Sequence, residues 1–525
     1  MASRGKKLPA RKGNGARAAR SEGAGNGKPA LAAIVLAAGK GTRMRSSRAK
    51  VLHELVGRPL IAYPIDLARA AGADPVVAVL GHQIDAVGKV LESRFGAGKI
   101  TIVEQAEQRG TGHAVRLAMP ALTKALAAAQ DEKENENEKA KAEAQVLVLY
   151  GDVPLLRRET LAELVGTARR YRCLALVTAT PPDPTGYGRI RRDQRGHVIG
   201  VVEHKDATPD ELGIREINAG IYCGPADFFR EATATLRSSN AQGEYYLTDI
   251  VARAAASIGV SAIEASFHDV AGINDRAQLA EAEAAMRARI VGGWLAHASF
   301  RDPASATIEP DVHIGVDVEI GRNVTLRGNT RIDHDARIGD GSVLTNVQVG
   351  AGVEIRPYTV ATDASIGAGA IIGPFAHLRP GTQIGVEAHV GNFVELKKTV
   401  LGKGSKANHL TYLGDSKIGE KVNVGAGTIT CNYNGYEKFT TVIDDGAFIG
   451  SDTQLIAPVK VGKRAVVAAG TTVTEDVAAG ALVLSRVAQI QKPGYADKVA
   501  KKYAQKKEPQ KKYGEKKQTE SRKSG

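Results

Sequence analysis

Residues 314–344 read IGVDVEIGRNVTLRGNTRIDHDARIGDGSVL, with an aliphatic residue at every sixth position. The period continues in two further series, so that the aliphatic positions are Ile314, Ile320, Leu326, Ile332, Ile338 and Leu344; Ile366, Ile372, Leu378, Ile384, Val390 and Leu396; and Ile443, Ile449, Leu455, Val461, Val467 and Val473. A period of six is neither helical nor that of a simple strand, and internal repeats outweigh local propensity. It predicts a triangular prism of parallel strands, in which each hexad points one aliphatic side chain inward and three hexads complete a coil.

Polar stretches interrupt this period, and a purely structural prism has no need for them. They are LRPG (378–381), NFVELKK (392–398), NHLTYLGD (408–415), NVGAGTITCNYNG (423–435) and SRV (485–487). A coil of about 18 residues places positions near 379, 397 and 415 above one another. Stacked Arg379 and Lys397 would bind a phosphate, and the alternative is two solvated surface charges. His409 is a candidate base for removing a proton from an amine, and the alternative is a structural histidine.

Before residue 300 the helical and strand patterns alternate. Apolar runs at 33–37, 76–80, 146–150 and 173–179 are separated by amphipathic stretches, which predicts a parallel sheet with helices on both faces. A chain of 525 residues is too long for one core. We expect a disordered basic tail at 1–30, an α/β domain at 31–275, a linker helix at 276–300, the prism at 301–487 and a disordered Lys-rich tail at 488–525. Residues 131–144 read as a charged helical insertion at the surface.

The net charge of +14 belongs to the two tails. Residues 1–30 carry +7 and residues 492–525 carry +8, so the remainder is 14 − 15 = −1. We interpret the tails as solvated segments, and RNA or an anionic surface as the alternative partner, for which Tyr495, Tyr503 and Tyr513 could stack. No apolar run is long enough to span a membrane, the N-terminus lacks the apolar core of a secretory signal, and three cysteines form no CxxC. These features predict a cytoplasmic protein with free thiols.

The first apolar run leads into LAAGKGTRM (36–44). Gly39 and Gly41 let backbone N–H groups approach phosphates, and Lys40 and Arg43 add positive charge. Asp152 follows the strand predicted at 146–150, where ligands bind in open α/β sheets. A carboxylate there can hold Mg²⁺ against a triphosphate, and the alternative is a helix N-cap.

These stretches, together with QAEQRGTGHA (105–114), YGDVP (150–154), TGYGRI (185–190), VEHKDA (202–207), EINAG (216–220) and GIN (272–274), carry a resemblance. The prism resembles the hexapeptide-repeat acyltransferases, whose β-helix is left-handed. Residues 31–492 resemble the bifunctional uridylyltransferase/glucosamine-1-phosphate acetyltransferases of bacterial UDP-N-acetylglucosamine synthesis. The resemblance implies a Rossmann-like nucleotidyltransferase domain followed by a left-handed parallel β-helix, with UTP and acetyl-CoA as substrates, Mg²⁺ as cofactor and a homotrimer formed through the β-helix.

The same resemblance implies a role for individual residues. In acetyl transfer, His409 is the catalytic base, and the residues that bind glucosamine-1-phosphate are Arg379, Lys397, Tyr412 and Asn423. The acetyl-CoA contacts are Ala426, Asn432, Tyr433, Ser451, Ala469 and Arg486. In uridylyl transfer, Arg43 and Lys50 neutralise phosphate charge, and Asp152 and Asn274 hold Mg²⁺. The residues that bind UTP or UDP-N-acetylglucosamine are Leu36, Ala37, Ala38, Gly39, Lys50, Gln105, Gly110, Thr111, Tyr150, Gly151, Asp152, Gly188, Glu203, Asn218 and Asn274.

Two alternative functions are weighed against this one. The chain could be another sugar-1-phosphate nucleotidyltransferase with a non-catalytic β-helix, but the motifs at 408–415 and 423–435 argue against that. It could be a non-catalytic, nucleotidyltransferase-like regulatory subunit, but the presence of Lys50, Asp152, Asn274 and His409 together argues against it.

Overall fold

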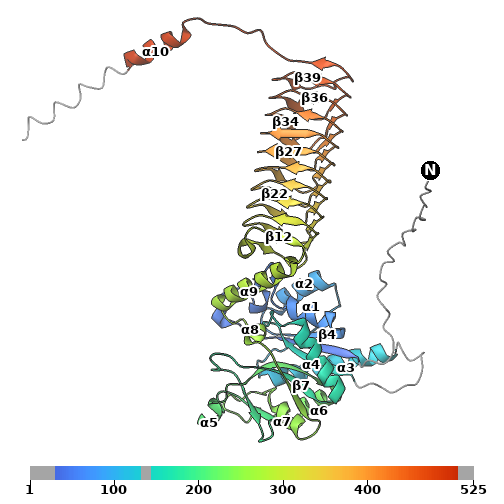
Figure 1. Cartoon of the computed structure of the whole chain (residues 1–525), viewed down its shortest axis with the longest axis vertical. Coiled ribbons are helices and arrows are strands. Elements are labelled where there is room, and N and C mark those ends of the chain that lie inside the picture. The colour runs from blue at the N-terminus through green and yellow to red at the C-terminus, as the bar shows by residue number, and fades with distance from the viewer. Residues whose placement is uncertain (1–29, 132–143, 507–525) are drawn as a thin grey trace, which may run out of the picture. The chain divides into compact units, whose positions relative to one another are not determined.

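The computed structural model describes residues 30–131 and 144–506, which divide into two compact units (Figure 1). The N-terminal unit holds the described residues up to Ala296 together with Asp302–Val312 and Leu326–Gly328. The C-terminal unit holds His297–Arg301, His313–Thr325 and the described residues from Asn329 onward. The expected tail at 1–30 and the insertion at 131–144 lie, apart from their edge residues, outside the described residues.

The N-terminal unit is built on one twisted sheet with the strand order β11-β7-β10-β6-β1-β4-β5. These strands are β1 (Leu31–Ala37), β4 (Ala73–Leu80), β5 (Thr101–Glu104), β6 (Gln145–Tyr150), β7 (Leu174–Ala179), β10 (Ile217–Pro225) and β11 (Val260–Glu264). All neighbours on this path are parallel except β10, which runs antiparallel between β6 and β7. An antiparallel ribbon of β8 (Arg189–Arg192) and β9 (Val198–Val202) branches from β10. The predicted parallel sheet is confirmed, and β10 is the antiparallel strand inserted among its parallel neighbours.

Helices cover both faces of this sheet, as predicted. Alternate residues of β1 face opposite cores, with Val35 on one side and Ile34 on the other. The first core is closed by α1 (Ala62–Ala70), α2 (Ile84–Phe95) and α4 (Arg158–Tyr171), and the second by α3 (Thr111–Asp131), α6 (Ala226–Ala234) and α7 (Asp249–Ala255). Burial on both faces explains why these strands are continuous apolar runs rather than alternating ones.

A further helix, α9 (Arg276–Trp294), occupies most of the segment expected to be a linker. It packs within the N-terminal unit, where Ala282 and Met286 join a core with Leu55, Tyr63 and Ile273. The helix ends at Trp294, and Ala298–Phe300 already form the strand β12. Short elements complete the N-terminal unit: β2 (Glu54–Leu55), β3 (Arg58–Pro59), α5 (Pro209–Leu212) and α8 (Phe267–Val270).

The C-terminal unit is a three-sided parallel β-helix in which every third strand belongs to the same sheet (Figure 1). Sheet I contains β12, β15 (Val318–Ile320), β18 (Arg337–Ile338), β21 (Glu354–Ile355), β24 (Ile371–Ile372), β27 (His389–Asn392), β30 (Lys406–His409), β33 (Asn423–Val424), β36 (Phe448–Ile449), β39 (Val466–Val467) and β41 (Leu482–Val483). Sheet II includes β19 (Val343–Thr345), β22 (Val360–Thr362), β25 (His377–Leu378), β28 (Glu395–Lys397), β31 (Tyr412–Gly414), β34 (Ile429–Cys431), β37 (Gln454–Ile456) and β40 (Thr472–Val473). Sheet III contains β14 (His313–Ile314), β17 (Arg331–Ile332), β20 (Gln348–Val349), β23 (Ser365–Ile366), β26 (Gln383–Ile384), β29 (Val400–Leu401), β32 (Ser416–Ile418), β35 (Thr441–Ile443) and β38 (Val459–Val461).

The inward aliphatic positions of the hexads are confirmed. Every member of the three series is at most 4% exposed. The coils differ in length, since Ile366 pairs with Ile384, 18 residues on, but Leu396 pairs with Leu413, only 17 on. One coil is longer, because Ile418 pairs with Ile443, and the excess of 25 − 18 = 7 residues lies in the loop at 432–440. These changes of length reset the period and explain why the sequence shows three series rather than one.

Beyond the prism, the structure differs from the expectation of a disordered tail starting at 488. Tyr495–Lys506 form the helix α10, and the remaining residues, 507–525, lie outside the described part. Tyr495, Val499 and Tyr503 recur every four residues among alanines and lysines, which favour helix. None of the helices within 30–131 and 144–506 has the length and apolar character that crossing a membrane requires.

Two candidate active sites

The first candidate site lies where the central strands β1 and β6 end. The chain passes from β1 to β4 on one side and later returns to β6 on the other, and ligands bind at such a switch point in open α/β sheets. The two strand ends are in close contact, since Gly151 donates its N–H to the carbonyl of Leu36 at 2.8 Å. A Cβ at Gly151 would lie 3.0 Å from that of Ala37. Glycine therefore lets β6 end here and places Asp152 beside the loop after β1.

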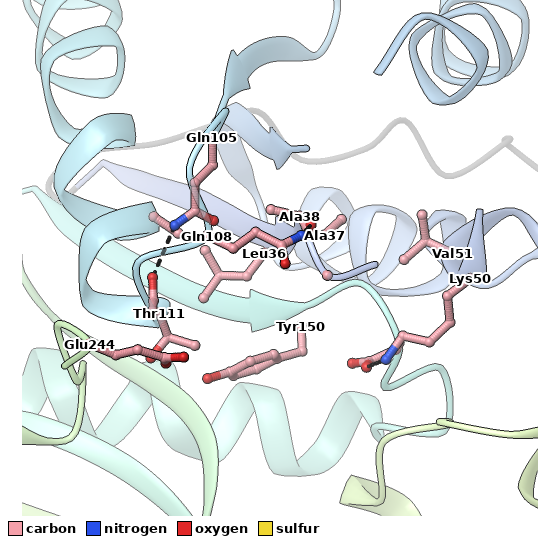
Figure 2. A pocket seen from close by; sticks show the side chains of 14 residues that line it. Leu36, Ala37, Ala38, Lys50, Val51, Gln105, Gln108, Thr111, Tyr150 and Glu244 are labelled. Carbon is pink, nitrogen blue, oxygen red and sulfur yellow. Dashed lines mark hydrogen bonds and ion pairs between the residues drawn. The ribbon is translucent and has the colours of Figure 1, made fainter. Parts of the chain in front are cut away.

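A cavity of about 300 Å³ opens at this edge of the sheet (Figure 2). In Figure 2, Tyr150 lies between Lys50 on one side and Thr111 and Glu244 on the other. The predicted nucleotide-binding residues that line this cavity are Leu36, Ala37, Ala38, Gly39, Lys50, Gln105, Gly110, Thr111, Tyr150 and Asp152. Residues from four separate parts of the sequence are thus brought around one space.

A second cavity of about 480 Å³ shares Thr111, Tyr150 and Asp152 with the first. The other predicted residues that line it are Arg43, Gly188, Glu203, Asn218 and Asn274. Gly151 lines neither cavity, and its place in the structure is the strand contact described above. The structure therefore gathers every other predicted uridylyltransferase residue around two adjoining cavities.

Cations and oxygen ligands meet where the cavities join. Lys50 Nζ forms an ion pair with Asp152, and both side chains are largely buried. Asn274 Oδ1 accepts hydrogen bonds from Arg43 Nη2 at 2.9 Å and from Lys50 Nζ at 3.4 Å. No cluster of three or more His, Cys, Asp or Glu side chains that could hold a metal occurs in the described residues. One carboxylate and one amide oxygen fit a hard divalent cation that takes its other ligands from phosphates and water.

The antiparallel strand β10 positions Asn218 in the second cavity. The register between β10 and β7 shifts between Asn218 and Tyr222, and Asn218 Nδ2 donates to the Tyr222 hydroxyl at 2.6 Å. Gly220 has a φ of +77°, and a Cβ there would lie 2.5 Å from Cε2 of Tyr150. The bulge is therefore possible only with glycine at this position, because the Tyr150 ring fills the space above it.

Glu203 and Tyr150 form the polar wall of these cavities. Burial raises the pKa of Glu203, whose carboxylate accepts a hydrogen bond from Thr248 Oγ1 at 2.8 Å. Burial, followed by the negative charges of Glu203 and Asp152, raises the pKa of Tyr150, so its phenol stays neutral at physiological pH. A neutral hydroxyl and a carboxylate can donate to and accept from the hydroxyls of a sugar.

The second candidate site lies on the prism, along one edge of sheet I. Ala407 pairs with Val424, Val424 with Ile449, and Ile449 with Val467. The residues two positions later occupy equivalent places on four successive coils, and we call them the His409 column: His409, Ala426, Ser451 and Ala469. Arg486 lies at the end of this column, since its Nη2 donates to the Ala469 carbonyl at 3.1 Å. Small side chains beyond an exposed histidine leave room for an extended ligand.

The His409 ring is exposed and has one side-chain partner within the described chain. Its Nδ1 lies 3.0 Å from Oδ1 of Asn392, which is the residue paired with it across one coil. Tyr412 begins the next strand of sheet II, and Asn423 begins the next strand of sheet I. The catalytic candidate is thus placed at the corner between these two sheets.

The predicted stacking of two cations is confirmed on sheet II. Leu378 pairs with Leu396, so the next residues, Arg379 and Lys397, lie one above the other. The third position is Gly414 rather than 415, since this coil has 17 residues. Arg379 Nη1 is paired with Glu395 at 2.7 Å.

The loop at 432–440 adds a third cation, Lys438, to this group. Contact with Lys438 and its charge, followed by the charge of Arg379, lower the pKa of Lys397. In the same loop, Asn432 Nδ2 donates to Asp415 at 2.6 Å, and Tyr433 is exposed. Three cations at one place, offset only in part by the Glu395 carboxylate, are a strong site for a phosphate.

Sequence reasoning missed several residues of these sites. Gln108 lines the first cavity and donates to the Ala38 carbonyl at 2.5 Å, and it lies within a motif already singled out at 105–114. Glu244, Tyr246 and Thr248 line the second cavity, and no spacing in the sequence marks them. Asn392 opens the polar stretch singled out at 392–398, but its pairing with His409, like the approach of Lys438 to Lys397, becomes recognisable only through the fold of the coils.

Comparisons with known proteins agree with both halves of this description. Residues 33–209 match the family model of the MobA-like NTP transferase domain, and residues 440–475 match the bacterial transferase hexapeptide (six repeats), which confirms the predicted fold class. A protein of Sorangium cellulosum named "Bifunctional protein GlmU" is 52% identical over 474 residues, covering 89% of this chain and 96% of its own length. A protein of the same name from Pelobacter propionicus is 47% identical and covers 90% of this chain and 99% of its own length. Another, from Anaeromyxobacter dehalogenans, is 48% identical and covers 91% of this chain and 94% of its own length. The chain therefore belongs to the family of bifunctional GlmU proteins, as its motifs predicted.

Proposed function

We propose that this bifunctional enzyme carries out its two reactions at the two sites described above. The enzyme transfers acetyl from acetyl-CoA to glucosamine-1-phosphate, and then uridylyl from UTP to N-acetylglucosamine-1-phosphate, giving UDP-N-acetylglucosamine and pyrophosphate. We assign uridylyl transfer to the domain at 31–275 and acetyl transfer to the prism at 301–487, with the helix at 276–300 as the connecting segment. The single observation that carries this assignment is that the candidate residues of each reaction fall into separate clusters.

In uridylyl transfer, the first cavity holds the nucleotide and the second holds the sugar. An oxygen of the sugar phosphate attacks the α-phosphorus of UTP, and the bond to the β-phosphate breaks to release pyrophosphate. Arg43 and Lys50 neutralise negative charge at the phosphates, which favours the charged transition state without a covalent step. Asp152 and Asn274 would hold Mg²⁺, which supplies further charge neutralisation when bound. Lys50 must then exchange its ion pair with Asp152 for a phosphate.

In acetyl transfer, Arg379 and Lys397 hold the phosphate of glucosamine-1-phosphate, with Tyr412 and Asn423 at the sugar. Acetyl-CoA lies along the His409 column, where Asn432, Tyr433 and Arg486 complete its contacts. The amine nitrogen forms a bond to the thioester carbonyl carbon, and the carbon–sulfur bond breaks. His409 Nε2 takes the proton lost by the amine and delivers it to the departing thiolate, so one amide and one thiol result.

We further propose that three copies associate through their prisms and that the enzyme works in the cytoplasm. The flat faces of a hexapeptide prism suit side-by-side packing, which supports the trimer. Free thiols suit a reducing compartment, and Cys173, Cys223 and Cys431 are free in the structure. Light scattering should give the mass of a trimer, and a monomer would contradict this proposal.

Two variants separate the reactions. Asp152→Ala should abolish pyrophosphate release from UTP and N-acetylglucosamine-1-phosphate while thiol release from acetyl-CoA and glucosamine-1-phosphate continues. His409→Ala should do the reverse, and chelation of divalent metal should reproduce the first pattern alone. If either variant lost both activities while remaining folded, or if the wild-type protein released no thiol, the assignment would be overturned.

A further inference from the structure

We propose that Asn392 is a positioning residue for His409, which holds the imidazole in the tautomer that can act as a base. This inference rests on the proposed role of His409. Asn392 Oδ1 accepts the hydrogen of His409 Nδ1 across a distance of 3.0 Å. The proton is thereby kept on Nδ1, and Nε2 keeps a free lone pair.

The backbone holds the two side chains in register. Asn392 ends β27 and His409 ends β30, and the two residues are directly paired. Leu410 donates its N–H to the Asn392 carbonyl at 3.1 Å. Phe393 and Leu410 then turn the chain with φ values of +56° and +45°, so both coils leave the strand in the same way. The amide and the imidazole therefore start from equivalent positions on adjacent coils.

The residue before Asn392, Gly391, has no space for a side chain between the two coils. A Cβ at Gly391 would lie 1.9 Å from the carbonyl oxygen of Asn408. Only glycine fits between the two backbones here, which keeps Asn392 within hydrogen-bond reach of the ring. The glycine before Asn392 is thus part of the same arrangement.

The chemistry of a neutral imidazole makes this contact decisive. One ring nitrogen carries the hydrogen and the other accepts a hydrogen bond or a proton. An acceptor placed beside one nitrogen keeps the hydrogen on that nitrogen and leaves the other free to act as a base. If the amide were turned to donate to Nδ1, the hydrogen would move to Nε2 and no base would face the substrate. The histidine is exposed, so without a partner its ring would also sample several rotamers.

The charged groups around the His409 ring cannot hold its tautomer in place of Asn392. Lys406 lies on the same strand as His409, and His389 lies on the strand of Asn392. Burial, followed by the charges of Arg356 and Lys406, lowers the pKa of His389, so it adds no permanent charge near neutral pH. The amide of Asn392 is the side-chain acceptor that His409 has within the described chain.

Three substitutions in the full-length enzyme test the inference. Asn392→Leu and Asn392→Ala should lower kcat for thiol release by about 10- to 100-fold, by analogy with partners that orient metal-ligating histidines, with KM changed by less than about twofold. In Asn392→Asp the carboxylate can only accept from Nδ1, so this variant should recover most of kcat. It should also move the acidic limb of the pH–rate profile to higher pH, since a carboxylate raises the pKa of the imidazole. Pyrophosphate release by the same molecules should be unchanged.

The matched control is Asn346→Ala. Asn346 Nδ2 also bonds a side chain 17 residues away, Asp363, at 3.0 Å, but away from the candidate site. This variant should keep kcat. The inference is overturned if Asn392→Leu keeps wild-type kcat, or if Asn392→Asp falls as far as Asn392→Leu with an unmoved pH profile. If His409→Ala also retains thiol release, the proposed function fails; if it is inactive while Asn392→Leu is normal, only this inference fails.

Discussion

Gly391→Ala should disable acetyl transfer through a single methyl group. The added Cβ would meet the carbonyl oxygen of Asn408 at 1.9 Å and its carbonyl carbon at 2.6 Å, both of which are backbone atoms that cannot swing aside. The contact must relax to at least 3.4 Å, so the coils must separate locally by about 3.4 − 1.9 = 1.5 Å. Asn392 and His409, which follow these two residues, move apart with them.

The size of the effect follows from that displacement. A misplacement of about 1 Å costs about 100-fold in rate, which corresponds to about 2.7 kcal/mol of transition-state stabilisation. Overpacking of this kind also costs about 1–3 kcal/mol of stability. We therefore expect kcat for thiol release to fall by about 100-fold or more and the prism to unfold at a lower denaturant concentration, while pyrophosphate release is retained.

Gly402→Ala is the matched control for this experiment. Its Cβ would meet the carbonyl oxygen of Gly419 at 2.2 Å, which is a similar clash between coils. Gly402 lies before β30, at the edge of sheet I opposite to the edge where His409 ends that strand. Thiol and pyrophosphate release are measured side by side on both variants, together with unfolding midpoints. If Gly391→Ala kept kcat within about threefold of wild type, or if Gly402→Ala lost as much thiol release, the reasoning from local displacement would be refuted.

Three further outcomes can be checked. Gly220→Ala should lower pyrophosphate release by at least about 10-fold and spare thiol release, since its Cβ would lie 2.5 Å from the Tyr150 ring; unchanged release would contradict the bulge argument. Leu378→Ala removes a fully buried side chain of the prism and should cost about 2–5 kcal/mol in chemical unfolding of that unit, and a loss below about 1 kcal/mol would mean that the coils collapse around the gap. Because burial raises the pKa of Glu203 above 4.5, its protonation favours the folded state, and that contribution is lost as pH rises through the folded-state pKa. Glu203→Gln should therefore gain thermal stability relative to wild type as pH increases from about 4.5, and a difference independent of pH would argue against this.

The site in the N-terminal unit was largely predictable because its residues occupy compact motifs at the ends of strands. Strand ends of a parallel sheet converge on one edge, so Gly39 and Asp152 could be placed together without coordinates, while Lys50 was placed there by the family resemblance. The position of Asn218 could not be predicted in this way, because β10 runs antiparallel and a bulge after Asn218 sets the direction of its side chain. The wall formed by Glu244 and Thr248 comes from a stretch without any periodic signal.

For the prism, the sequence by itself determined which side chains point inward. Burial repeats with each hexad because each strand and corner has a nearly constant length, and that is a local property of the chain. The tertiary structure alone decided the register between coils, because it depends on where a corner loses one residue or gains seven. A period of six cannot show that Asn392 faces His409 or that Lys438 reaches Lys397, since such pairs are set by contacts between coils rather than along them.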